Sequence, residues 1–213
     1  MSLDIKKERG YLVVLSGPSG VGKGTIGAKM LEAHSDMCFS VSATTREIRE
    51  GEKEGVNYFY KTKEEFEQMI ANGEFLEYMQ VFGKNYYGTP RGFVEEKLAG
   101  GMSVLLDIDV QGAMVVKKNY PDALLIFIAP PSLEELYRRL VGRGTETLEA
   151  VERRFAQAKT EFTYVNNYDF VVVNDDLAVA VQDVEAILRA RELSSESYKE
   201  QVFGLLNKEA QES

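Results

Sequence analysis

The sequence has no tryptophan, one cysteine and one histidine. The lone Cys38 excludes an internal disulfide, and we expect a packed, unreactive thiol. His34 has no cysteine or second histidine at metal-ligand spacing, which argues against a zinc site. No apolar run is long enough to cross a membrane, and the N-terminal segment lacks the apolar stretch of a signal peptide. These absences predict a cytoplasmic protein without a membrane partner.

An excess of positive charge is also missing. Against 34 Asp and Glu the chain has 25 Lys and Arg, for a net charge of −9. Proteins that bind the nucleic-acid backbone usually concentrate basic residues, so we expect no nucleic-acid partner. Positive charge is nevertheless grouped in one stretch, where it can serve a small anionic ligand or form a solvated helix face with the neighbouring glutamates. That stretch contains Arg138, Arg139, Arg143, Arg153 and Arg154.

A glycine-rich turn follows the apolar run at residues 11–15 and precedes a helical pattern. In such a turn successive backbone N–H groups converge on phosphate oxygens, the helix N-terminus adds its positive end, and a lysine reaches the β- and γ-phosphates. The alternative is an ordinary turn between a strand and a helix, which rarely has this context. We predict a phosphate-binding loop for a nucleoside triphosphate. The turn consists of Gly17, Pro18, Ser19, Gly20, Val21, Gly22 and Lys23.

The loop departs from the common pattern at the next position, where a magnesium-binding Ser or Thr usually follows the lysine. Here that position is Gly24, and the next hydroxyl belongs to Thr25. Neighbouring side chains on a helix point about 100° apart, so Thr25 does not simply replace the missing ligand. We expect Mg²⁺ to be held largely by water and by the nucleotide.

Short apolar runs alternate with helical patterns along the chain. Runs at 11–16, 104–107, 124–129 and 170–173 have the composition of strands covered on both faces. Helical patterns occupy residues 23–33, 111–119, 133–140, 148–165 and 177–193. The alternation predicts an α/β fold with a parallel central sheet flanked by helices. Residues 40–90, with short aromatic strands around a helical pattern at 63–71, look like an inserted substrate subdomain.

Several ordered blocks resemble the bacterial guanylate kinases, which belong to the P-loop nucleoside monophosphate kinase superfamily. The resemblance covers residues 10–191 and is more specific than the loop alone. It implies one domain at 10–194, with a core at 10–39 and 91–194, an acceptor-binding subdomain at 40–90, a helical lid at 138–158, and a C-terminal tail or helix at 195–213. The matching blocks are residues 40–52, 57–59, 73–78, 85–89, 106–112, 127–132, 142–147 and 173–177.

The resemblance implies ATP-dependent phosphorylation of GMP, and of dGMP, and it assigns acceptor-binding residues. One carboxylate can accept hydrogen bonds from both N1–H and the 2-amino group of guanine, and the resemblance gives this role to Glu77. It places the hydroxyls of Ser42 and Thr89 at the other guanine edge. Two arginines three residues apart can converge on one phosphate, and nearby phenols can donate to its remaining oxygens. The resemblance names Arg46, Arg49, Tyr58 and Tyr87 for this group.

Other roles concern the donor and the transfer step. Asp107 ends an apolar strand, where such folds place an acid that organises metal and water; the alternatives are contact with guanine or a helix N-cap. Asn174 resembles the residue that contacts the adenine of ATP, with a turn-forming asparagine as the alternative. By resemblance, Arg139, Arg143 and Arg154 close over the transferring group. No general base is needed, because the acceptor phosphate is already anionic near neutral pH.

Two other functions stay open from the sequence. Guanylate-kinase-like domains in some scaffold proteins bind peptides and have lost catalysis, but Lys23, the paired arginines and the lid arginines favour an enzyme. A kinase for another nucleoside monophosphate is compatible with Gly24 and Thr25, whereas Glu77 favours guanine. The sequence leaves the choice between a monomer and a homo-oligomer open.

Overall fold

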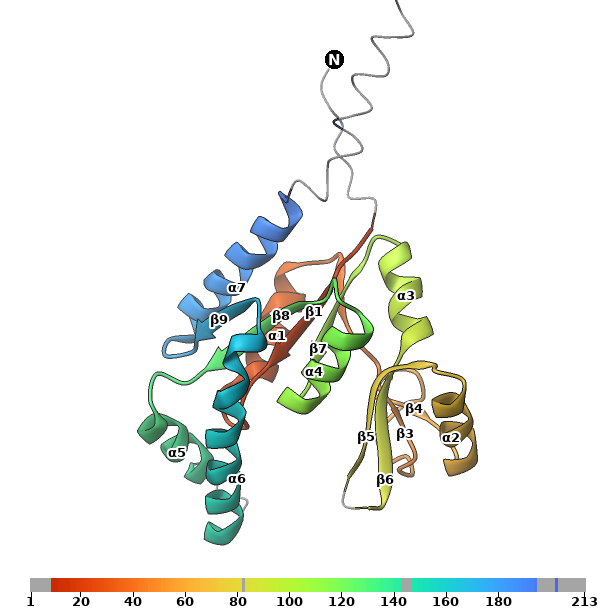
Figure 1. The fold of residues 1–213 in the computed structure, drawn as a ribbon, viewed down its shortest axis with the longest axis horizontal. Helices are drawn as coiled ribbons and strands as arrows, with labels where there is room; N and C mark the ends of the chain where they lie inside the picture. Colours follow the sequence, from red (N-terminus) through yellow and green to blue (C-terminus); the bar gives the residue numbers. More distant parts are fainter. Residues whose placement is uncertain (1–8, 82, 143–146, 195–201, 203–213) are drawn as a thin grey trace, which may run out of the picture.

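The structure, a computed structural model, describes residues 9–81, 83–142, 147–194 and 202. Its centre is a five-stranded parallel sheet in the order β2-β7-β1-β8-β9 (Figure 1). The middle strand β1 pairs with β7 on one side and β8 on the other, so the loop after β1 begins at the centre of the sheet edge. The strands are β1 Leu12–Ser16, β2 Met37–Phe39, β7 Ser103–Asp107, β8 Leu124–Ala129 and β9 Phe170–Val173.

Helices cover both faces of this sheet, as the apolar runs predicted. Leu12 and Val14 of β1 point to one face and Val13 and Leu15 to the other, and all four are fully buried. The first pair packs with α3 (Arg91–Ala99) and α4 (Val110–Asn119). The second pair belongs to a cluster with residues from four helices. These are α1 Lys23–Ala33, α5 Leu133–Val141, α6 Leu148–Glu161 and α7 Leu177–Glu192.

Strand β9 is an exception to the prediction that every apolar run is covered on both faces. It pairs with β8 at the edge of the sheet. Val172 is buried, but Phe170, Val171 and Val173 are 40%, 51% and 48% exposed. An edge strand has less covering structure than a central one, which its apolar composition alone does not reveal.

A second, smaller sheet lies to one side of the first, in the order β4-β3-β6-β5. It has its own core, in which the Phe66 ring stacks on Phe75 at 4.4 Å and on Tyr86 at 5.2 Å between ring centroids. Figure 1 shows this sheet and α2 on one side of the lower part of the molecule, with α5 and α6 on the other. The elements are β3 Ala43–Thr44, β4 Phe59–Tyr60, α2 Lys63–Ala71, β5 Phe75–Val81 and β6 Asn85–Pro90.

Helix boundaries agree well with the sequence where local signals are strong. The predicted helix at 63–71 has the observed bounds, and a capping box between Thr62 and Glu65 begins it. The helix predicted at 148–165 is α-helical only to Glu161 and continues as the 3₁₀-helix η1, Phe162–Asn167. Helix α3 was not predicted from the sequence. None of the helices in the described ranges is long and apolar enough to cross a membrane.

Candidate active site

The turn between β1 and α1 has a backbone that only glycine adopts easily. Gly17, Gly20 and Gly22 have φ angles of 132°, 91° and 93°. A Cβ at Gly17 would lie 2.3 Å from the carbonyl oxygen of Ile128, and a Cβ at Gly22 only 2.4 Å from Asn174 Nδ2. Gly22 is the N-cap of α1 and has no side chain to cap the first N–H groups. These N–H groups can therefore receive an anion.

Lys23 opens α1 and folds back over this turn. Its Nζ donates hydrogen bonds to the carbonyl oxygens of Gly17 at 2.7 Å and Pro18 at 3.2 Å. Arg154 of α6 approaches the same turn, with 3.4 Å between Nη1 and Ser19 Oγ. The fold thus brings two of the predicted cations to the predicted phosphate-binding loop.

Asn174, directly after β9, hydrogen-bonds to this loop. Its side chain is 6% exposed and donates from Nδ2 to the carbonyl oxygen of Val21 at 2.8 Å. Arg139 of α5 donates to the Asn174 carbonyl oxygen at 2.9 Å and to Glu135 at 2.7 Å. The expected contact of Asn174 with adenine stays a prediction. Arg143 lies outside the described residues.

Asp107, at the end of β7, faces the start of α1. A Cβ at Gly24 would lie 3.3 Å from Asp107 Oδ2, so a serine at this position would face the carboxylate. Asp109, not Asp107, caps α4 by accepting a hydrogen bond from Gly112 N at 2.8 Å, which leaves Asp107 available. Desolvation raises the pKa of Asp107, and the charge of Lys23 partly opposes this rise.

The fit of this region to Mg²⁺ can be judged from its donors. In the described part of the chain, no three side chains of His, Cys, Asp or Glu are grouped so that they could hold a metal ion. Thr25 is exposed one residue beyond Gly24. Because Mg²⁺ typically keeps several waters and binds through one or two carboxylates plus phosphate oxygens, the single carboxylate of Asp107 fits such a site.

A buried carboxylate lies in the smaller sheet, on the side of α4. Glu77 of β5 and Thr89 of β6 are cross-strand neighbours, 7% and 0% exposed, and Thr89 Oγ1 donates to Glu77 Oε1 at 2.7 Å. Burial raises the pKa of Glu77. The half-buried Ser42 precedes β3. Thr89 supplies hydrogen bonds from its side chain and its backbone, and a buried carboxylate can accept more, so this position suits a ligand that supplies N–H groups.

A cation and two phenols lie close together around strands β3, β4 and β6 of this sheet. The Arg46 guanidinium carbon lies 5.3 Å from the centroid of the Tyr58 ring, and the Tyr58 and Tyr87 rings are 6.0 Å apart, edge to face. The Arg49 side chain is exposed on the turn that follows Arg46. Four residues predicted to bind the acceptor phosphate thus lie in one region.

Glu52 belongs to this cluster, and sequence reasoning missed it. Its carboxylate forms a two-pronged ion pair with Arg46 at 2.8 and 3.0 Å and accepts from Tyr60 Oη at 2.8 Å and Arg49 N at 2.9 Å. The hydrogen bonds from Arg46, followed by that from the Arg49 backbone, lower the pKa of Glu52 to about 2. The available signal was an acid close to two arginines in a glycine-containing turn, a pattern that also fits a solvated loop.

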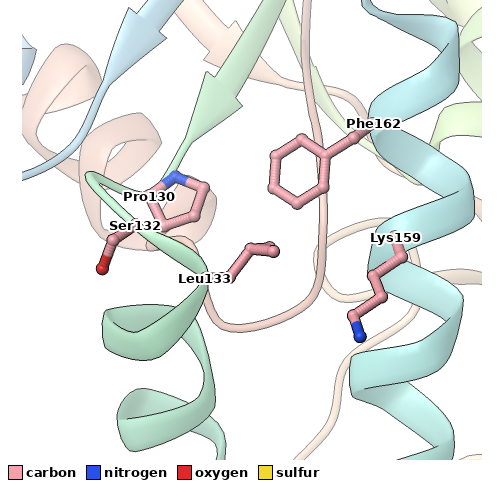
Figure 2. A pocket seen from close by; sticks show the side chains of 5 residues that line it. All are labelled: Pro130, Ser132, Leu133, Lys159 and Phe162. Carbon is pink, nitrogen blue, oxygen red and sulfur yellow. The ribbon is translucent and has the colours of Figure 1, made fainter.

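Helices α5 and α6 separate at their core-side ends. A hollow of about 440 Å³ lies between the start of α5 and the end of α6 (Figure 2). Its walls are largely apolar, and Phe162 and Leu133 point into it from opposite sides. The lining residues are Pro130, Ser132, Leu133, Lys159 and Phe162.

The segment from β7 into α4 connects the two candidate sites. At its start, Asp107 faces Gly24 of the phosphate-binding loop. One turn into α4, a Cβ at Gly112 would lie 3.6 Å from Glu77 Oε2. A triphosphate-binding loop and a second anion-binding site thus flank one strand end. This arrangement defines a P-loop kinase that acts on a small phosphorylated acceptor.

Comparisons with known proteins identify the family within this class. Residues 9–191 match the family described as guanylate kinase. A guanylate kinase of Oceanobacillus iheyensis is 52% identical over 200 residues, 94% of this chain and 97% of the relative. One from Listeria monocytogenes is 49% identical over 203 residues, 93% and 98% of the two chains. The crystal structure of guanylate kinase from Anaplasma phagocytophilum aligns with a TM-score of 0.67 and 39% identity over 89% of both chains. The chain belongs to the guanylate kinase family.

Proposed function

We propose that this chain catalyses the reaction ATP + GMP → ADP + GDP by direct in-line transfer of the γ-phosphoryl group, and that it also accepts dGMP. The observation that carries the proposal is the β7–α4 segment, which faces the phosphate-binding loop at Asp107 and the buried Glu77 at Gly112. Phosphoryl transfer asks a protein mainly to align donor and acceptor and to neutralise charge. The two flanking sites meet that need.

In this proposal Glu77 selects guanine. Its carboxylate accepts from N1–H and the 2-amino group, while Ser42 and Thr89 donate toward the O6 and N7 side. Adenine has no such pair of donors and would leave a buried carboxylate without partners, which costs free energy. Before the base arrives, the Thr89 hydroxyl donates its one proton to Glu77 at 2.7 Å and holds the carboxylate in place. Once the N–H groups of guanine bind the carboxylate, this hydroxyl is free to turn toward the base.

The GMP phosphate binds Arg46, Arg49, Tyr58 and Tyr87. The oxygens of this dianionic phosphate replace or share the contacts that Glu52 makes with Arg46 and with the Arg49 backbone. Glu52 therefore keeps Arg46 extended across the Tyr58 ring when no phosphate is present. No side chain has to remove a proton from the acceptor, because the GMP phosphate is the nucleophile.

ATP binds through the loop from Gly17 to Thr25, with Lys23 on the β- and γ-phosphates and Asn174 near the adenine. Arg139, Arg143 and Arg154 surround the transferring group as α5 and α6 close. Mg²⁺, when bound, would neutralise phosphate charge and help to align the transferring group. Asp107 and Thr25 would hold it through bound water, from which Asp107 would accept hydrogen bonds.

The alternative of an inactive binding module has no observation in its favour. A peptide-binding role does not require Lys23 to lie within the loop or Glu77 to be buried against α4. We further propose a cytoplasmic enzyme of purine nucleotide metabolism whose partners are the two nucleotides and not nucleic acid or a membrane.

Replacement of Lys23 by methionine tests the proposal directly. We expect the Lys23→Met variant to lose ADP formation from ATP and GMP while its circular dichroism and melting temperature stay close to those of the wild type. Lys29→Met is the matched control, because Lys29 lies on the same helix and pairs with Glu32 at the surface. Activity of Lys23→Met within about tenfold of the wild type, roughly 1.4 kcal/mol in the barrier, would contradict the proposal.

A further inference from the structure

Glu161, the last residue of α6, is a buried acid to which the proposed function gives no role. Its side chain is 9% exposed, and its Oε1 accepts a hydrogen bond from Gln157 Nε2 at 2.8 Å, one turn earlier on the same helix. An ionised carboxylate is costly to bury unless nearby charge or hydrogen bonds compensate it. Its location therefore calls for a partner beyond Gln157.

Aromatic packing anchors this end of α6 to the end of β1. Phe127 of β8 is the neighbour of Ser16, the last residue of β1. The Phe127 ring lies 5.9 Å from that of Phe162, the residue after Glu161, and 5.0 Å from that of Tyr168. Tyr168 Oη in turn donates to Ser16 Oγ at 2.9 Å. Glu161 is thus held where the phosphate-binding loop starts.

The side chain of Lys23 also lies at the start of the phosphate-binding loop. Its Nζ is 2.7 Å from the carbonyl oxygen of Gly17, the residue after Ser16. Burial is the largest influence on the pKa of Glu161 and raises it; the hydrogen bond from Gln157 and then the charge of Lys23 lower it, and the charge of Asp109 raises it. Both side chains thus lie around the start of the loop at Ser16 and Gly17.

The same helix touches the loop at a second point. Arg154, about two turns before Glu161, approaches Ser19 Oγ at 3.4 Å. Helix α6 therefore brings a cation to one part of the loop and has a buried acid at its own end, near the start of the loop. A shift of α6 during closure would move both groups together relative to the phosphates.

We propose that Glu161 is a positioning residue for Lys23: from the end of the lid helix it orients the ammonium group toward the transferring phosphoryl group and offsets its charge until ATP arrives. The inference rests on the proposed function, because it assigns a further residue to the same transfer step. Glu161 acts through Lys23 and does not itself contact the substrates. Gln157 holds the carboxylate in the required direction.

The substitution Glu161→Gln removes the negative charge of this side chain and keeps its shape. In Glu161→Gln we expect kcat with saturating ATP and GMP to fall about tenfold, the KM for GMP to stay within about twofold, and the melting temperature not to fall. Glu161→Asp keeps the charge and should retain more activity than Glu161→Gln. Glu152→Gln is the matched control, because Glu152 is an exposed acid of the same helix that accepts from Tyr137 Oη at 2.8 Å.

ATP binding supplies a readout that does not depend on turnover. Without the opposing carboxylate, Lys23 should attract the triphosphate more strongly, so we expect Glu161→Gln to bind ATP at least about threefold more tightly by calorimetry. In a Lys23→Met background the same substitution should have no effect, because the coupling acts through the lysine. Unchanged kcat in Glu161→Gln, or an equal change in ATP affinity in both backgrounds, would overturn the inference. Failure of the wild type to phosphorylate GMP would contradict the proposed function instead, and the binding cycle would still report on the coupling.

Discussion

At the scale of single residues, three carboxylates show how environment sets the role of one functional group. Glu52 is paired with Arg46, and its pKa falls to about 2, so it stays ionised at any physiological pH. Burial raises the pKa of Glu77 and of Glu161. Glu52 already has its hydrogen-bond partners within the protein. Glu77 and Glu161 are buried, so the first needs partners from a ligand and the second needs compensating charge from Lys23.

Glu77→Gln tests the base assignment. The amide puts a donor opposite the donors of guanine, so we expect kcat/KM for GMP to fall about 10- to 100-fold, in line with a cost of roughly 1–3 kcal/mol for a mismatched buried pair. The same assay with AMP should show a relative gain in selectivity for AMP. Glu74→Gln serves as the control, because Glu74 is exposed just before β5. An unchanged GMP-to-AMP ratio in Glu77→Gln would mean that the base is recognised elsewhere.

The proximity of several predicted site residues could be expected from the sequence, whereas their partners could not. Arg46, Tyr58 and Tyr87 lie together as expected. The ion pair of Arg46 with Glu52 was not predicted, because it depends on how the turn between these two residues folds back on itself. Glu161 was missed for a different reason. Its burial follows from the packing of Phe162 on Phe127, a contact between distant segments.

At the scale of elements, the phosphate-binding loop is the part most tightly determined by local chemistry. Gly22 combines a φ of 93° with the close approach of Asn174. We expect Gly22→Ala to weaken ATP binding at least about tenfold, because the Cβ both strains the backbone, by roughly 1–2 kcal/mol, and displaces the Asn174 side chain. Calorimetric titration with ATP provides the measurement.

Gly101→Ala is the matched control for this prediction. Gly101 has a similar φ of 83°, but a Cβ there would meet nothing within 4 Å. It should therefore lower the melting temperature through backbone strain while leaving ATP affinity unchanged. Equal ATP affinities in the wild type and Gly22→Ala would show that the loop tolerates a side chain at position 22.

Elements with local start and stop signals were predictable, and those that depend on context were not. The capping box at Thr62 and the alternation of β1 between two cores are visible in the sequence. The exposure of β9 follows from its position at the sheet edge. No glycine or proline marks the change from α-helix to 3₁₀-helix after Glu161, so the sequence does not predict it.

At the scale of the whole molecule, we expect the elements around the donor and acceptor sites to close over the two nucleotides. The smaller sheet with α2 lies on one side of the central sheet edge and α5 with α6 on the other (Figure 1). A hollow lies between the start of α5 and the end of α6 (Figure 2). An open site would allow water to attack ATP, so transfer to GMP favours closure around both nucleotides.

Solution X-ray scattering measures this closure. We expect the radius of gyration to decrease when GMP and a non-hydrolysable ATP analogue are both present, and to decrease less with either alone. The protein without nucleotide is the reference. No compaction with both nucleotides bound would contradict the closing movement.

We propose that this chain transfers a phosphoryl group from ATP to a guanine nucleotide that Glu77 selects. The measurement that decides this is ADP formation from ATP and Mg²⁺ with GMP, AMP, UMP and dTMP supplied separately. We expect turnover with GMP, at most slight turnover with the other three, and none in Lys23→Met. Preference for another monophosphate, or GMP binding without turnover, would contradict it.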